Sequence, residues 1–183
     1  VYGPTAISLH AHGAAVAVAL RGGAGSRDDA AGREGTAWLL ARVVEEQVAR
    51  ALDTVPAVFT ASVERATAVF TLVAEPSAWP AAWRIADSVV FQAPVDPELV
   101  EQHRAAMLDA LAFESGSPYQ EFEAVSATLL CEPGSPWARP PRGTPASLAA
   151  LGAADLERYR ADHLRRDAGA WAVVGPASPA ISA

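Results

Sequence analysis

The sequence contains no lysine and no asparagine, and all 14 of its basic residues are arginines. Together with abundant alanine, these absences are typical of a GC-rich genome, and we expect a bacterial source. Basic clusters are also missing, since 21 acidic residues give a formal net charge of −7 and Arg165-Arg166 is the only adjacent pair. Because neutralising phosphates requires grouped Arg or Lys side chains, we expect no nucleic-acid partner.

Cysteines and long apolar runs are equally scarce. Cys131 is the single cysteine, which excludes an internal disulfide and is typical of a reducing compartment, so we expect a cytoplasmic location. The run GAAVAVALRGG is interrupted by Arg21, well short of the ~20 apolar residues that span a membrane. No membrane partner is therefore expected. Hydrophobic residues still make up 51% of the 183 residues, enough for the core of one domain.

The spacing of apolar residues predicts an α+β domain with one sheet packed against helices. Alternating or β-rich runs predict strands within residues 5–11, 14–23 and 168–176, and a hairpin within 57–75. Helical spacing predicts helices at about 36–52, 77–91, 97–114, 119–130 and 155–164, the third of them with Asp96 as N-cap and Pro97 at its first position. Residues 131–151 contain five prolines and are predicted to be an irregular connection.

A Gly-rich, charged turn precedes the first of these helices. The stretch Ala24-Gly25-Ser26-Arg27-Asp28 is followed by Gly35-Thr36-Ala37 and then by the apolar helix. This arrangement resembles the M16 peptidase family, the group of insulinase, pitrilysin and mitochondrial processing peptidase. In that family an H-x-x-E-H helix follows, which places two zinc-binding histidines and a general-base glutamate on one face. The resemblance implies the α+β fold of that family, with a mostly antiparallel sheet packed against helices.

The chemical groups of that zinc helix are absent here. In the register of the resemblance, Trp38 takes the place of the first histidine, Ala41 of the glutamate and Arg42 of the second histidine. The segment PVDPELVEQHRAAMLDALAFES is similar to the helix that supplies the third ligand, and aligning Arg104 places Ala110 at that position. No H-x-x-E-H or H-E-x-x-H occurs elsewhere in the chain. The resemblance therefore implies a catalytically degenerate chain with no metal cofactor.

Two interpretations of Trp38 and Arg42 are open from the sequence. Because these residues are four apart on a helix, the guanidinium can lie over the indole and fill the space that metal and water occupy in an active relative. Alternatively, Trp38 is an ordinary core residue and Arg42 a surface residue paired with Glu45 or Glu46.

The hairpin carries a second candidate site. The family resemblance implies that its first strand is an edge strand that pairs with peptide, here Ala57, Val58, Phe59, Thr60 and Ala61. Pairing through backbone hydrogen bonds needs no particular side chain, so this surface can outlast the loss of catalysis. The alternative is a strand that only closes the sheet.

The function implied by the resemblance is that of a noncatalytic M16-like subunit or domain. It would pair as a heterodimer with an active M16 zinc peptidase subunit or sister domain and enclose a peptide-binding chamber with it. A purely structural homologue with no role in proteolysis is the alternative. We expect residues 1–183 to form a single M16-like domain that belongs to a longer chain or a multi-subunit assembly, because a lone domain would leave its packing face exposed.

Overall fold

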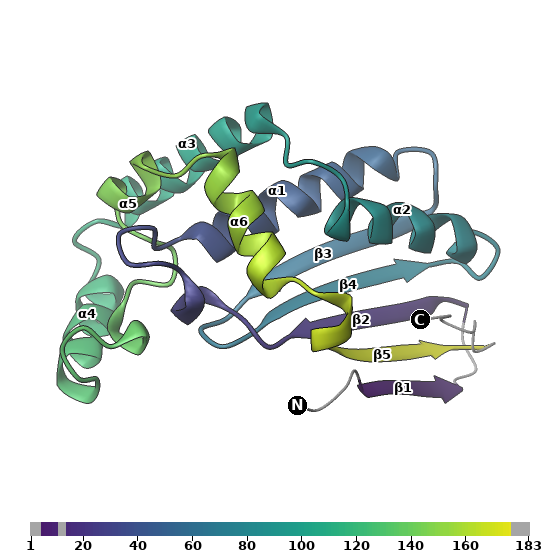
Figure 1. Cartoon of the computed structure of the whole chain (residues 1–183), viewed down its shortest axis with the longest axis horizontal. Helices are drawn as coiled ribbons and strands as arrows, with labels where there is room; N and C mark the ends of the chain where they lie inside the picture. Colours follow the sequence, from purple (N-terminus) through teal and green to yellow (C-terminus); the bar gives the residue numbers. More distant parts are fainter. Residues whose placement is uncertain (1–4, 11–13, 177–183) are drawn as a thin grey trace.

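The fold is a single five-stranded sheet with helices on one face, seen in a computed structural model that describes residues 5–10 and 14–176 (Figure 1). The strands are β1 (Thr5–His10), β2 (Val16–Gly22), β3 (Ala57–Val63), β4 (Ala68–Ala74) and β5 (Ala170–Gly175). The helices are α1 (Thr36–Ala51), α2 (Trp79–Phe91), α3 (Pro97–Glu114), α4 (Pro118–Leu130), α5 (Pro145–Ala149) and α6 (Ala153–His163). Short 3₁₀ turns lie at Ser26–Asp28, Pro136–Ala138 and Arg166–Ala168.

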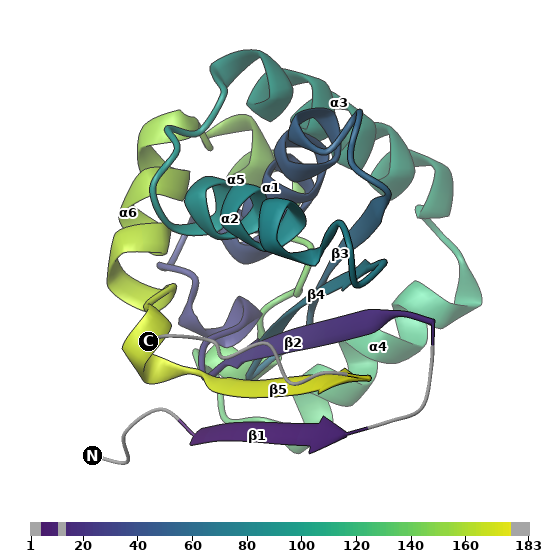
Figure 2. The ribbon, with the colours of Figure 1, turned by 90° about the vertical axis from the view of Figure 1, so that its right-hand side faces the viewer.

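The strand order is β1-β5-β2-β4-β3, so β1 and β3 are the two edges (Figure 2). β1 and β5 run parallel, whereas the other three neighbouring pairs are antiparallel. The predicted α+β class with a mostly antiparallel sheet is therefore confirmed. The predicted hairpin is also confirmed, because β3 and β4 pair from Ala57↔Ala74 to Val63↔Ala68.

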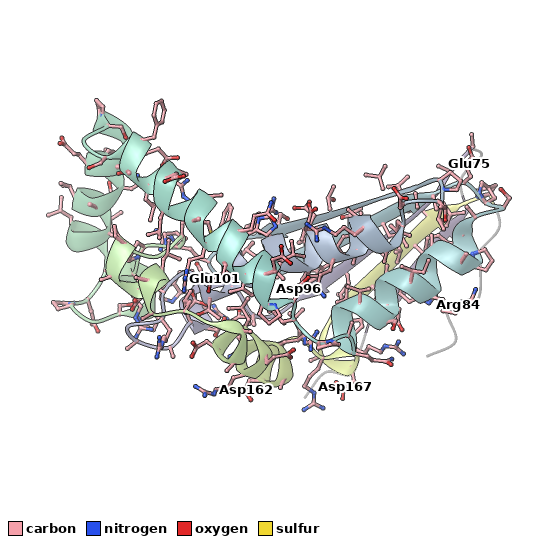
Figure 3. All side chains as sticks on the ribbon, turned by 90° about the horizontal axis from the view of Figure 1, so that it is seen from above. Glu75, Arg84, Asp96, Glu101, Asp162 and Asp167 are labelled. Atoms are coloured by element: carbon pink, nitrogen blue, oxygen red, sulfur yellow. The ribbon has the colours of Figure 1, made fainter. Side chains whose placement is uncertain are left out.

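Helices α1 and α2 cover one face of the sheet, and α3 and α6 pack around α1 (Figures 1 and 2). The start of α3 follows the sequence prediction: Asp96, labelled in Figure 3, caps it by accepting a 2.9 Å hydrogen bond from the Glu98 N–H, and Pro97 opens the helix. Proline fits there because the first helical N–H has no partner within the helix.

The prediction for residues 131–151 is wrong in part. A 3₁₀ turn and the short helix α5 interrupt the irregular connection. Thr144 caps α5 through its hydroxyl, which accepts from the Ser147 N–H at 3.1 Å, and Pro145 takes the first turn. The five prolines predicted an irregular segment, but a proline in the first turn of a helix is compatible with helical structure.

Helix α4 lies apart from the helix layer, at the left end of Figure 1. Of the regular elements, it packs mainly on the 3₁₀ turn at Pro136–Ala138. Large apolar side chains on α4 and at the end of α3 are exposed: Phe113, Phe122, Val125, Leu129 and Leu130. Among the described residues no helix is both long enough and apolar enough to cross a lipid bilayer.

Candidate functional site

Helix α1 is the element that the family resemblance predicts to correspond to the zinc helix. Its apolar stripe points into the core, where Leu39, Leu40, Val43, Val44 and Val48 are almost completely buried. This spacing of three and four residues is what anchors a helix against a sheet. The predicted helix is therefore confirmed, and it lies directly against the edge strand β3.

The start of α1 is fixed by a carboxylate from the preceding loop. The Asp29 side chain accepts hydrogen bonds from the Gly35 N–H at 2.8 Å and from the Ala37 N–H at 2.9 Å. These are N–H groups that a helix start leaves without partners. Gly35 has φ of 96°, and a Cβ there would lie 2.8 Å from Leu148, so the turn requires glycine.

Asp29 is only 2% exposed, and this burial raises the pKa of its carboxyl to about 7 although the two N–H bonds favour the ionised form. A carboxyl whose pKa is higher in the folded than in the unfolded state stabilises the fold below pH ~4 and loses that contribution as the pH rises through 7.

We expect the stability of the wild-type protein to fall, relative to that of an Asp29→Asn variant, by on the order of 3 kcal/mol between pH 4 and pH 8. Urea unfolding of both proteins across this range measures the difference. Asp53→Asn, which removes an exposed carboxylate beyond the end of α1, is the control and should keep the wild-type profile. Parallel profiles for wild type and Asp29→Asn would contradict the expectation.

Trp38, Ala41 and Arg42 occupy one side of the first half of α1. Ala41 is buried at 2% exposure, whereas Trp38 is partly buried against the core. The Arg42 guanidinium carbon lies 5.9 Å from the centroid of the Trp38 ring, and its Nη1 lies 2.7 Å from Glu45 Oε2. The structure contains the contact that each interpretation requires, since the cation faces the indole and also pairs with Glu45. That this pair fills the space of a metal site stays a prediction.

Ala110, the fourth position given by the family resemblance, lies on α3. Ala110 is exposed, and no hydrogen bond, ion pair or ring contact in the described part of the chain joins it to Trp38 or Arg42. His103 lies on the same face of α3 as Ala110, because a separation of seven residues makes nearly two helical turns. Burial lowers the pKa of His103, and the carboxylates of Glu46 and Glu45 act against this shift.

Three nitrogens in this region are buried and have no hydrogen-bond partner among the described residues: Trp38 Nε1, Arg42 Nε and His103 Nε2. Burying a polar group without a partner is costly, so native proteins contain few such atoms. Two of the three nitrogens belong to the predicted relic site, which comprises Trp38, Ala41, Arg42 and Ala110.

These residues do not fit a zinc ion. An indole and two alanine methyl groups offer no ligand, and a guanidinium remains protonated and repels a cation. Within residues 5–10 and 14–176 no cluster of three His, Cys, Asp or Glu side chains is placed to hold a metal. The assignment of Trp38, Ala41, Arg42 and Ala110 to the four family positions stays a prediction.

The strand β3 is an edge strand, as the sequence predicts. Val58 and Thr60 turn their side chains to the open face of the sheet, whereas Phe59 and Ala61 point into the core. The sequence did not predict what happens at Ala61: its N–H donates to Glu45 Oε1 at 3.1 Å, and its C=O accepts from Arg42 Nη2. The only signal was the Arg42–Glu45 spacing of three residues, which predicts an ion pair but not its contact with a strand.

A groove lies between α4 and residues 138–145. It is lined by apolar side chains that include Leu111, Pro140 and Pro141, and by polar groups that include Arg65 and Arg142. Arg65 donates to the carbonyls of Trp137 and Arg139, and Arg142 pairs with Glu114. Because its lining includes no residue of α1 or β3, the groove is separate from the relic site.

Solved structures share this arrangement of sheet and helices. The inactive domain of an M16 peptidase from Pseudomonas fluorescens matches 96% of this chain with a TM-score of 0.85 at 18% sequence identity. The chain has the fold of an M16 peptidase domain. The M16 fold is found again in pitrilysin, with a TM-score of 0.76 over 92% of the chain at 18% identity. Complex III2 from Candida albicans contains a chain that matches 95% at a TM-score of 0.68 and 18% identity.

This M16 fold spans less than half of each matched chain: 45% of the Pseudomonas domain structure, 19% of pitrilysin and 42% of the complex III2 chain. No protein-family model matches the sequence, and no curated protein matches it. The likeness therefore lies in the backbone arrangement, which the core of α1 and the five-stranded sheet define.

Proposed function

We propose that this chain is a noncatalytic M16-like domain that pairs with an active zinc-peptidase half and forms one wall of a peptide-binding chamber. The observation that carries the proposal is the first half of α1. The helix keeps a buried apolar stripe and a capped start, while Trp38, Ala41 and Arg42 provide neither a metal ligand nor a general base. A helix kept for its packing but without reactive groups is what a noncatalytic partner requires.

Comparison of the folds supports the pairing. The Pseudomonas structure is described as an inactive M16 domain, and this chain corresponds to under half of its length. The active half would supply zinc and the general base. This chain would supply the edge strand Ala57–Val63 and the helices that support it.

A purely structural role is the second candidate, and one observation favours it. The backbone of Ala61, in the strand that would pair with peptide, is already hydrogen-bonded to Arg42 and Glu45. The fold also matches a chain of complex III2 from Candida albicans. In either role we propose a cytoplasmic location, as the single cysteine predicts.

The test is to isolate the native protein with its partners and identify them. We expect a stoichiometric partner that carries an intact H-x-x-E-H helix, and cleavage of a fluorescence-quenched peptide by the pair but not by this chain alone. Removing the chain from the pair should lower that cleavage at least tenfold, because one wall of the chamber is lost. Cleavage by the partner that does not depend on this chain would favour the structural role instead.

Metal analysis of the isolated chain provides the second arm of this test. We expect no stoichiometric zinc and no change of the thermal unfolding midpoint on adding a chelator, because the described residues at the relic site offer no ligand set. One zinc per chain, or peptidase activity of the isolated chain that a chelator abolishes, would overturn the proposal.

A further inference from the structure

The free edge of β3 offers backbone groups in a fixed alternation. The Glu64 N–H donates to the Thr67 C=O at 2.8 Å, so Glu64 faces β4 at the hairpin end. In an antiparallel pair successive residues face the partner strand and the free edge in turn. The residues of β3 whose N–H and C=O groups face the free edge are therefore Ala57, Phe59, Ala61 and Val63.

At Ala61 both free-edge groups are occupied by side chains of α1. Glu45 Oε1 accepts from the N–H, Arg42 Nη2 donates to the C=O, and a 2.7 Å ion pair between Arg42 Nη1 and Glu45 Oε2 joins the two side chains. One acceptor and one donor at neighbouring positions are what a residue of an added strand would present. The ion pair thus makes, at Ala61, the two backbone hydrogen bonds that a neighbouring β-strand would make.

Phe59 is the neighbouring residue of β3 whose backbone groups also face the free edge. The alternation turns the Phe59 N–H and C=O to the same edge, and no partner for these groups lies within the described part of the chain. An extended peptide that pairs at Phe59 would run past Ala61 two residues later. It would meet Arg42 and Glu45 there, because a strand advances only about 6.6 Å in two residues.

We propose that Arg42 and Glu45 form a latch on Ala61, and that an extended peptide binds the β3 edge only when this latch opens. The proposal rests on the proposed peptide-binding function and adds its regulation. Opening is feasible because the side chains are partly exposed, at 34% and 25%, so that water can hydrogen-bond to the separated charges. The entering peptide replaces the lost contacts with its own N–H and C=O groups. The guanidinium carbon of Arg42 already lies 5.9 Å from the Trp38 ring centroid, a contact that does not involve Ala61.

The first measurement tests the latch itself. In a double variant Arg42→Ala/Glu45→Ala, the Ala61 amide should exchange with deuterium at least about tenfold faster than in the wild type, because its acceptor is gone. The control variant Glu46→Ala/Arg50→Ala removes an exposed ion pair of the same charge from the same helix. It should leave the Ala61 amide unchanged. Equal exchange in all three proteins would overturn the latch.

The second measurement tests what the latch controls. The probe is a fluorescein-labelled peptide with the sequence of residues 67–75, which includes β4, flanked by two arginines at each end for solubility. The same peptide with N-methylated alternate amides cannot pair and is the control ligand. Fluorescence anisotropy should show binding to the latch-free variant about tenfold tighter than to the wild type, whereas Glu46→Ala/Arg50→Ala should behave as the wild type.

The outcomes separate the latch from the function on which it rests. Equal binding to the wild type and the latch-free variant would overturn the latch and leave peptide binding standing. Absence of binding to every protein, with urea unfolding midpoints that show them folded, would overturn the peptide-binding function together with its latch. Binding of the N-methylated peptide as tightly as the unmodified one would show that the edge of β3 is not the site, and would overturn both.

Discussion

Replacing Gly25 with alanine is expected to lower the free energy of unfolding by at least about 3 kcal/mol. A Cβ at this position would lie 2.3 Å from the Glu64 carbonyl oxygen and 2.6 Å from the Thr67 nitrogen. These are backbone atoms of the β3–β4 turn and cannot rotate away. The Gly25 carbonyl also accepts a 2.9 Å hydrogen bond from the buried Tyr159 hydroxyl, which would move with it.

Gly23→Ala is the matched control, since a Cβ there meets no atom within 4 Å. It should change the free energy of unfolding by less than about 0.5 kcal/mol. Urea unfolding followed by circular dichroism measures both variants. If Gly25→Ala were as stable as Gly23→Ala, the close approach of the residue 24–28 turn to the hairpin would be wrong.

Placing a glutamate at the position that the family resemblance assigns to the general base, Ala41→Glu, is expected to destabilise the protein by about 3 kcal/mol or more. The Ala41 side chain is only 2% exposed and belongs to the hydrophobic core cluster. A carboxylate there would be buried, and Arg42 is already engaged with Glu45 and Ala61. The expected loss should shrink at low pH, where the new carboxyl is protonated and no longer charged.

Ala49→Glu is the control for this substitution, because Ala49 is exposed on the same helix. It should alter stability by less than about 0.5 kcal/mol. Urea unfolding at pH 5 and pH 8 separates the charge from the added volume. An Ala41→Glu variant as stable as Ala49→Glu at pH 8 would show that solvent reaches this position and that the space is not filled.

The elements that could be predicted from the sequence are those with a local signal. The apolar stripe of α1, the Asp96-Pro97 start of α3 and the alternation in the hairpin each act within a few residues, and the structure confirms all three. The helix α5 was missed because the number of prolines in residues 131–151 outweighed their position at a helix start. The position of a proline determines its effect on a helix, because in the first turn the missing N–H would have had no partner within the helix.

The contacts that define the site could not be predicted in the same way. Asp29 reaches the start of α1 across a loop, and Arg42 and Glu45 reach a strand 16 to 19 residues away. Such contacts depend on how the helix is placed on the sheet, which no local pattern states. The assignment of Trp38, Ala41 and Arg42 to the zinc-helix positions rests on the family resemblance and stays a prediction. The structure adds that Ala41 is buried, and that Trp38 Nε1 and Arg42 Nε are buried without a hydrogen-bond partner among the described residues.

The position of β5 in the sheet has a consequence for biosynthesis. β5, the most C-terminal strand described, lies between β2 and β1, which precede it by about 150 residues. On the ribosome, β2, β4 and β3 can assemble as soon as they emerge, but β1 has no neighbour until β5 arrives. Of the five strands described, the earliest in the chain is therefore the last to be incorporated, and until then its backbone is unpaired.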